Sequence, residues 1–242
     1  MDEDFDIDQS LDVIAYENGY TRAKWVAEKM VGRAREAGLP VSIYRPGFIE
    51  GDSRTGIGNP DDLFCRLLIG NLQLGMYPDF ARKFWLTVPV DFVARAMAHI
   101  VCTQPAGGNY NLLPAREQEP SNNALFELLG RELGRPMECV APHVWLRELG
   151  RIGPQNALFP LAGFLREKVY QNSRTVLELH YDTSLVRCDR TEAALAGTGV
   201  RCPNVDAPLL ALYVDRLRAH YALPPLPGAA GGAQEARLRR VA

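Results

Sequence analysis

The fold is decided by one continuous stretch, residues 18–49, which is written NGYTRAKWVAEKMVGRAREAGLPVSIYRPGFI. Its first part predicts a helix over about 18–37, which the leading Asn or Gly caps and a Gly followed by a Pro ends. Residues 41–45 then predict a short strand that Pro46 and Gly47 end. A helix, a tight loop and a strand in this order form half of a βαβ unit. The helix also carries a broad apolar face of the kind that packs on a sheet, made of Ala23, Trp25, Val26, Ala27, Met30, Val31 and Ala34.

Strands and helices continue to alternate along the rest of the chain. Residues 1–17 read as an acidic, irregular lead-in, 51–59 as a loop, and 223–242 as a disordered tail rich in Pro, Gly and Ala. Further strands are expected at 85–88, 110–113 and 138–141. Further helices are expected at about 62–72, 89–101, 121–134, 142–150, 155–170, 190–196 and 206–221. This order predicts an α/β protein whose last part is mainly helical.

The composition is that of an ordinary globular protein of 242 residues, 47% of them hydrophobic. With 27 basic and 29 acidic residues, the chain has no electrostatic footprint for nucleic acid. No apolar run approaches the roughly 18 to 20 residues that span a bilayer, and the acidic start lacks the apolar segment of a secretory signal. We therefore expect a cytoplasmic protein without a membrane or nucleic-acid partner.

Cysteine and histidine are scattered along the sequence. The five cysteines are an odd number and include no C-x-x-C pair, and none of the four histidines lies at ligand spacing. Widely spaced free thiols are typical of a reducing compartment. The sequence predicts neither a disulfide framework nor a metal site.

Tyr20 and Lys24 are the first candidate for chemistry. Residues four apart on a helix share one face, so the phenol and the ammonium are expected to lie together. A free phenol has a pKa of about 10, and an adjacent ammonium lowers that value by stabilising the phenolate. A tyrosine adjusted in this way can protonate an oxyanion as a hydride reaches the carbonyl carbon. A surface pair on an amphipathic helix is the alternative interpretation.

The end of the predicted strand is the second candidate. Ligands of open α/β sheets bind outside the carboxyl ends of the strands. The break at Pro46 and Gly47 would let backbone amides approach a ligand there. A turn that merely ends the strand is the alternative.

Three motifs in this order carry a resemblance to a known family. They are GYTRAKWVAEK at 19–29, YRPGFIEGDSRTG at 44–56 and PVDFV at 89–93. From about Asp2 to Leu223, the chain resembles the terminal thioester reductase domains of nonribosomal peptide and polyketide synthetases. These domains are extended short-chain dehydrogenase/reductases, related to carboxylic acid and aminoadipate reductases.

The resemblance implies an activity and its partners. It implies NADPH-dependent reduction of an acyl thioester held on the phosphopantetheinyl arm of a carrier domain. Hydride addition gives a thiohemiacetal, which collapses to an aldehyde and the carrier thiol. Some members reduce the aldehyde again to an alcohol.

Roles carry over by position. The resemblance implies that Tyr20 is the proton donor and that Lys24 is its electrostatic partner and a ligand of the nicotinamide ribose, so both are catalytic and cofactor-binding. Against the nicotinamide would lie Pro46, Gly47, Phe48 and Ile49. On the substrate side, with the helices after Glu119, would lie Gly51, Asp52 and Ser53. We expect Asp91 to cap its helix and fix the loop at Pro89 rather than to touch substrate.

The resemblance also divides the chain. Residues 1–115 would be the C-terminal half of an NAD(P)-binding Rossmann-like domain with a parallel sheet and an insertion at about 51–84. Residues 116–222 would form the helical substrate and carrier-binding region, and 223–242 the tail.

Two elements of the family are missing from this sequence. No Gly-rich turn follows a strand to hold a pyrophosphate, and no strand with a catalytic Ser or Thr precedes the tyrosine. The chain therefore matches the C-terminal half of the fold only. NADPH would lose most of its contacts, and the strand at 41–45 would show an unpaired apolar edge. We hypothesise a fragment, a truncated product, or a chain that needs a separate N-terminal half.

Three other functions compete with reduction. A decayed reductase half could be an inactive module that docks a carrier domain or partner subunit. A non-redox relative could close a ring by Dieckmann condensation, but such domains have lost the tyrosine that this chain retains. A hydrolase is disfavoured because the stretch from Gly51 to Gly56 has one residue more than G-x-S-x-G and no histidine is placed to serve it.

Overall fold

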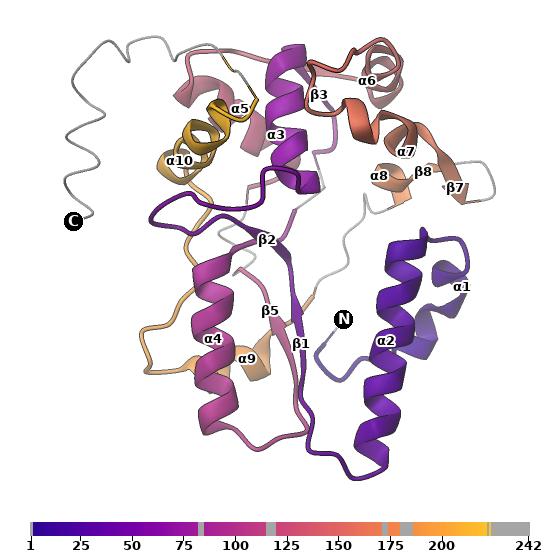
Figure 1. The fold of residues 1–242 in the computed structure, drawn as a ribbon, viewed down its shortest axis with the longest axis vertical. Coiled ribbons are helices and arrows are strands. Elements are labelled where there is room, and N and C mark those ends of the chain that lie inside the picture. The colour runs from indigo at the N-terminus through magenta and orange to yellow at the C-terminus, as the bar shows by residue number, and fades with distance from the viewer. Residues whose placement is uncertain are drawn as a thin grey trace.

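The computed structural model describes residues 2–81, 85–114, 120–170, 174–179, 186–221 and 223. Figure 1 shows two parts, one above the other. In the lower part, the strands β1 (Ile43–Pro46) and β5 (Asn109–Leu112) run between the helices α2 (Gly19–Glu36) and α4 (Val90–Thr103). In the upper part helices predominate. Parallel strands combined with many helices make this an α/β fold, as the sequence predicts.

The strands are short and pair mostly in parallel. β1 pairs with β5, and the rings of Tyr44 and Tyr110, opposite each other, stack at 5.4 Å. The other parallel pairs are β2 (Phe48–Glu50) with β4 (Thr87–Pro89) and β3 (Met76–Pro78) with β6 (Glu138–Val140), and the antiparallel pair is β7 (Lys168–Tyr170) with β8 (Arg174–Thr175). All four strands that the sequence predicts are present with shifted ends. β2, β3, β7 and β8 were not predicted.

β1 has one hydrogen-bonded neighbour, β5, among the described residues. The expectation of a strand with an open edge is thus confirmed for this part of the chain. An open edge presents unpaired N–H and C=O groups, which favour pairing with a further strand.

Several of the longer helices begin at residues whose side chains cap them. Asn18 accepts from the amide of Thr21, Asp62 from that of Phe64, and Asp206 from that of Leu209. The remaining helices are η1 (Ile7–Ser10), α1 (Leu11–Ile14), α3 (Leu63–Leu74), α5 (Asn122–Glu132), α6 (Pro142–Leu149), η3 (Phe159–Leu161), α7 (Ala162–Arg166), α8 (Val176–Leu179), α9 (Asp189–Leu195) and α10 (Ala207–Arg218).

The predicted helix over 155–170 is wrong as one element. Only η3 and α7 are helical there, and residues 168–170 form β7. Pro160 stands in the first turn of this helical run, where the missing N–H of a proline is tolerated, and is consistent with a helix that begins at 159 and not at 155.

α2 lies on the surface and not in a layer against the sheet. None of its residues is buried, and Val26 and Met30 are 49% and 67% exposed. The expectation that its apolar face packs on a sheet is therefore wrong here, because no described element covers the side that carries these two residues. The opposite side makes the contacts: the indole Nε1 of Trp25 donates to the carbonyl of Ile7 at 3.0 Å.

The acidic lead-in is folded, and so the expectation of an irregular segment is also wrong. It forms η1 and α1, and its Glu3 is 4% exposed. The Glu3 carboxylate accepts the amide hydrogens of Arg190 and Thr191 at 2.8 and 2.9 Å. These amides begin α9, where a helix has unpaired N–H groups and a partial positive charge. A partner so distant in sequence leaves no local signal.

The apolar residues form two clusters. One lies between β4, β5, α4 and α9 and contains Val88, Phe92, Val93, Ala96, Ile100, Tyr110, Leu112 and Leu195. The other joins α3, α5, α6 and α10, with Trp145 at 1% exposure. The segment between β2 and β4 contributes α3 and β3 to the second cluster, together with the helices of the C-terminal part.

Within the described ranges, no helix is long and apolar enough to cross a membrane. The predicted disordered tail lies, from residue 224 on, outside the described residues.

Candidate active site

Tyr20 and Lys24 lie together in the first turns of α2. Asn18 sets the start of the helix, since its side chain accepts the amide hydrogen of Thr21 at 3.0 Å. The Nζ atom of Lys24 lies 5.5 Å from the centre of the Tyr20 ring, within the range of a cation–π contact. Tyr20 is 72% exposed, and so its hydroxyl is open to a ligand.

Two contacts fix the position of α2 along the direction of β1. Near the end of α2, Arg35 donates to the Oδ1 atom of Asn109 at 2.9 Å, at the start of β5. Nearer the start of α2, Glu28 forms an ion pair at 2.5 Å with Arg45, which is the last residue but one of β1. α2 and β1 therefore run in opposite directions (Figure 1). Tyr20 precedes Glu28 by about 12 Å of helix axis and so lies level with or beyond the carboxyl end of β1.

The backbone at the Pro46–Gly47 corner is already hydrogen-bonded. The amide of Gly47 donates to the carbonyl of Leu112 at 3.1 Å, and the amide of Phe48 donates to that of Leu86 at 3.0 Å. The expectation that amides at this corner are open to a ligand is therefore wrong for these two. A Cβ atom at Gly47 would lie 1.8 Å from the Leu86 oxygen. Glycine is required here because two backbone segments approach each other closely.

The side chains after this corner offer apolar surface. Phe48 and Ile49 are 37% and 42% exposed. The Phe48 ring meets the buried Trp85 edge to face, with 5.7 Å between ring centres. Pro46 ends β1 opposite Leu112. The corner can therefore contact a flat ring by its side chains.

The loop after β2 is a closed turn held by its own carboxylate. The Oδ1 atom of Asp52 accepts the amides of Arg54 and Thr55, each at 2.9 Å. Burial opposes the charged form, but these hydrogen bonds outweigh it and lower the pKa of Asp52. The carbonyl of Gly51 accepts the hydroxyl of Tyr213, from α10, at 2.8 Å. The carboxylate and this carbonyl are thus engaged within the protein.

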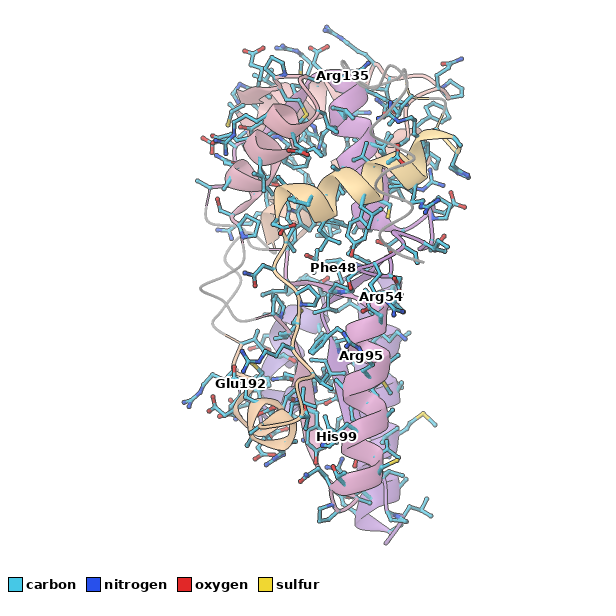
Figure 2. The ribbon with its side chains drawn as sticks, turned by 90° about the vertical axis from the view of Figure 1, so that its left-hand side faces the viewer. Phe48, Arg54, Arg95, His99, Arg135 and Glu192 are labelled. Carbon is cyan, nitrogen blue, oxygen red and sulfur yellow. The ribbon has the colours of Figure 1, made fainter. Side chains whose placement is uncertain are left out.

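Asp91 holds this loop against α4. Its carboxylate accepts the Ser53 amide at 2.8 Å and the Ser53 hydroxyl at 2.9 Å. The cap position of α4 is Pro89, which makes no side-chain cap. The expectation that Asp91 caps its own helix is therefore wrong, since Ser53 takes both of its oxygens. Arg95, one turn along, lies 3.4 Å from the same carboxylate (Figure 2).

A buried carboxyl lies directly under the loop. Glu50 is 4% exposed; its Oε2 atom lies 3.7 Å from the thiol of Cys65, and its Oε1 atom has no hydrogen-bond partner among the described residues. Burial, with a smaller contribution from Asp62, raises the pKa of Glu50 to about 9. The group is therefore uncharged at neutral pH.

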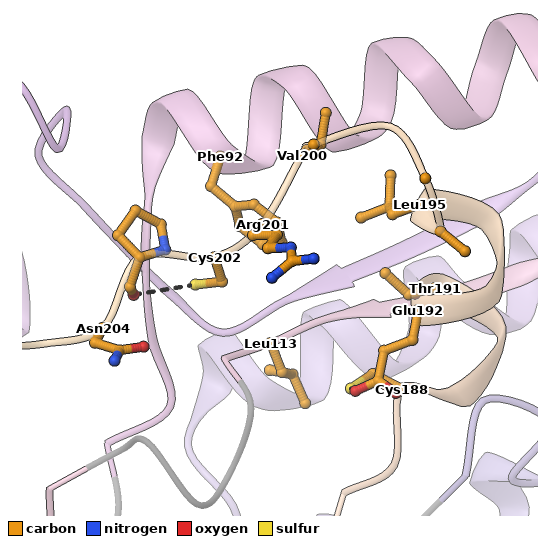
Figure 3. Close-up of a pocket in the computed structure, with 14 residues that line it drawn as sticks. Phe92, Leu113, Cys188, Thr191, Glu192, Leu195, Val200, Arg201, Cys202 and Asn204 are labelled. Atoms are coloured by element: carbon orange, nitrogen blue, oxygen red, sulfur yellow. Dashed lines mark hydrogen bonds between the residues drawn. The ribbon is translucent and has the colours of Figure 1, made fainter.

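A cavity of about 630 Å³ lies between α4, α9 and the loop that follows α9 (Figure 3). Phe92 and Leu195 form apolar walls, and the guanidinium of Arg201 points into it. None of the predicted site residues lines this cavity. Leu113 separates it from the corner, because this side chain lines the cavity and would lie 3.2 Å from a Cβ atom at Gly47. The predicted site and the cavity are thus neighbours and not one site.

Sequence reasoning missed the residues that position the site. Glu28 lies one turn after Lys24 and extends its stripe, so this spacing could have pointed to it. Its partner Arg45 and the loop contact of Tyr213 come from distant segments and leave no local signal. No three His, Cys, Asp or Glu side chains of the described residues lie together as metal ligands would.

The first part of the chain matches one family model. Residues 2–97 match NAD_binding_4, described as male sterility protein. The matched region contains the helix of Tyr20 and Lys24, the corner and the loop. A nicotinamide cofactor is what this family implies.

Relatives extend the match to most of the chain. The aldehyde reductase lnbA of Aspergillus flavus is 33% identical over 219 residues, which are 90% of this chain and 20% of that protein. The nonribosomal peptide synthetase asaC of the same species is 33% identical over 200 residues, 81% of this chain and 20% of that protein. The chain thus spans about a fifth of the length of these relatives.

One solved structure is similar to this chain in both sequence and fold. The terminal R domain from the myxalamid PKS-NRPS biosynthetic pathway is 31% identical with a TM-score of 0.78, over 94% of this chain and 55% of that one. By sequence and by fold, the chain is similar to part of the terminal reductase domains of nonribosomal peptide synthetases.

Proposed function

We propose that this chain carries the proton donor and the substrate side of a reductase that converts a carrier-bound acyl thioester into an aldehyde. The observation that supports this best is the placement of Tyr20. Its exposed phenol lies beside the Lys24 ammonium, level with or beyond the carboxyl end of β1, outside which ligands of α/β sheets bind. The similarity to reductase domains of peptide synthetases supports the same reaction.

The chain's own groups would act on the carbonyl oxygen. NADPH, when bound, would supply a hydride to the thioester carbon. Tyr20 gives its proton to the oxygen as negative charge develops there, and Lys24 stabilises the phenolate that remains. The resulting thiohemiacetal loses the carrier thiol and leaves an aldehyde. A second hydride and proton would give an alcohol.

The residues fit the nicotinamide end of the cofactor. Lys24 can donate to ribose hydroxyls, and the exposed side chains of Phe48 and Ile49 offer a surface for the ring. The pyrophosphate has no Gly-rich turn in this sequence. We propose that a segment with this turn pairs with the open edge of β1.

Gly51, Asp52 and Ser53 would then form a wall of the substrate site and not its hydrogen-bonding groups. The Asp52 carboxylate and the Ser53 amide and hydroxyl are engaged within the protein. The loop instead presents the side chains of Arg54, 74% exposed, and Ile57, 65% exposed. Figure 2 shows Arg54 between the helical part and α4, beside Phe48.

The test is an assay of the purified chain with NADPH and an acyl-phosphopantetheine thioester, in which mass spectrometry detects the aldehyde. Aldehyde formation that Tyr20→Phe abolishes would support the proposal. Tight NADPH binding with turnover by this chain alone would overturn the need for a further segment. If a carrier domain binds but no aldehyde forms, even with the rest of the domain supplied, the chain is instead a docking module.

A further inference from the structure

A second, smaller cavity lies against the other side of the loop, and the reaction proposed above does not use it. Its volume is about 190 Å³. The loop contributes the bare backbone of Gly51, Gly56 and Gly58 to its wall, and the α10 segment contributes Arg216 and His220. We call it the glycine-loop pocket.

The α10 side of the pocket supplies a guanidinium and an imidazole. The Nε atom of Arg216 donates to the carbonyl of Thr55 at 2.7 Å, which fixes the guanidinium beside the loop. Its two terminal nitrogens make no hydrogen bond within the described part of the chain and remain available to a ligand. His220 follows one turn later, and its side chain is 47% exposed.

Two acidic groups around the pocket are neutralised. The Oδ1 atom of Asp61 lies 3.9 Å from His220 Nε2, but the same oxygen is ion-paired with Arg66. Glu50 lies behind the lining residue Cys65 and is uncharged at neutral pH, because burial raises its pKa to about 9. Asp62 also lies near Cys65, and its side chain accepts the amide hydrogen of Phe64. Among the residues that line the pocket, Arg216 carries the full charge.

We propose that the glycine-loop pocket binds the phosphate group of the carrier's phosphopantetheine arm. A guanidinium binds phosphate oxygens in a bidentate manner. A pocket of 190 Å³ is below the usual size of a nucleotide or drug-sized site but has room for one phosphate group. The inference rests on the proposed function, since it assigns the arm of that same substrate to one side of the loop.

The nucleotide is the other source of phosphate. The loop follows β2 and is bound to α10, whereas the open edge of β1, where the missing Gly-rich turn would join, lies toward α2. The position of the pocket therefore favours the arm over the nucleotide.

The test compares two probes by calorimetry on the full chain: an S-acyl phosphopantetheine and the same compound without its phosphate. The wild-type chain should bind the phosphorylated probe about tenfold tighter or more. Arg216→Gln keeps an N–H that can reach the Thr55 carbonyl but removes the charge, and should abolish that preference without changing the affinity for the dephosphorylated probe. His220→Asn should weaken the preference in part.

Arg147→Gln is the matched control, because this exposed arginine on α6 lies away from the pocket and its loss should leave the preference intact. Equal binding of both probes by the wild-type chain would overturn the inference and leave the proposed function standing. Binding of neither probe would overturn both. If Arg216→Gln weakened NADPH binding instead, the phosphate would belong to the nucleotide and the assignment to the arm would be wrong. A urea unfolding midpoint for each variant separates lost binding from lost folding.

Discussion

At the scale of single residues, the phenol of Tyr20 is exposed, so a substitution there tests the reaction with little effect on the stability of the fold. The side chain is 72% exposed, and the Lys24 ammonium is the ring contact that the structure gives it. Its hydroxyl can therefore be removed without disturbing a core. Glu50 differs from Tyr20, because it is buried and its protonation state affects the stability of the fold.

Tyr20→Phe should lower the rate of thioester reduction by about 10²- to 10⁴-fold, the usual contribution of a positioned proton donor. The free energy of unfolding should change by less than about 0.5 kcal/mol, as for most surface substitutions. Aldehyde formation and urea denaturation measure the two effects. Tyr16→Phe, in the segment before α2, removes a phenol outside the proposed site and should retain the activity. Equal rates for Tyr20→Phe and the wild type would rule out Tyr20 as the donor.

The raised pKa of Glu50 predicts that the free energy of unfolding depends on pH. Its pKa is raised from 4.5 to about 9 on folding, so between these values the folded chain holds a proton that the unfolded chain has lost. The contribution is full below about pH 4.5 and is lost as the pH rises toward 9, by at most about 1.4 kcal/mol per pH unit. Glu50→Gln should flatten this slope in urea denaturation between about pH 6 and 8.

Glu148→Gln is the control for that slope. The arginines at 147 and 151 lower the pKa of Glu148, which therefore does not titrate in this range. An unchanged slope in Glu50→Gln would show that the Glu50 carboxyl is ionised in the folded chain.

At the scale of elements, one ion pair sets the position of the helix that carries Tyr20. Arg45 of β1 and Glu28 of α2 are only 19% and 21% exposed, whereas Lys29 and Asp8 form a pair at 34% and 45% exposure. Exposed pairs are screened by water, and partly buried ones less so. The two pairs on one helix therefore offer a direct comparison.

A double-mutant cycle on Glu28→Gln and Arg45→Gln should give a coupling free energy of about 1–3 kcal/mol in urea denaturation. The same cycle on Lys29→Gln and Asp8→Asn should give less than about 1 kcal/mol. Glu28→Gln should also lower the reduction rate, because the helix that carries Tyr20 is no longer held in place against β1. Similar coupling in both cycles would contradict the positioning role of the first pair.

At the scale of the whole molecule, an open edge and an apolar helix face lie on the same side of the strands. β1 has one strand neighbour among the described residues, and α2 exposes Val26 and Met30. Such a surface favours association with another chain. We also propose that residues 63–80 belong with the helical region, since α3 and β3 pack in its core.

The isolated chain should therefore self-associate at micromolar concentration, and Met30→Lys should reduce this association by placing a charge on the apolar face. Sedimentation velocity over a range of concentrations measures it. Val101→Lys is the control, because Val101 is 65% exposed on α4, on the far side of the strands. A wild-type chain that stays monomeric over the whole concentration range would show that this surface does not drive association.

Local sequence signals predicted much of the fold and part of the site. The Asn18 cap, the alternation of strands and helices and the four-residue spacing of Tyr20 and Lys24 are short-range features, and all are found in the structure. The burial of α2 was predicted wrongly, because an apolar stripe shows that a helix can be covered and not what covers it. The Glu3 contact with α9 and the Asp91 contact with Ser53 were missed because each joins segments far apart in the chain.

By itself, the sequence determined the α/β class, the start of the tyrosine helix and the placement of Tyr20 beside Lys24, since these depend on neighbours within a few positions. The tertiary structure alone decided that the corner amides are occupied, that Glu28 and Arg45 hold the helix, and that Arg216 meets the glycine loop. Hydrogen bonds and ion pairs act over a few ångströms in space, and folding brings together groups that the chain keeps up to 188 positions apart.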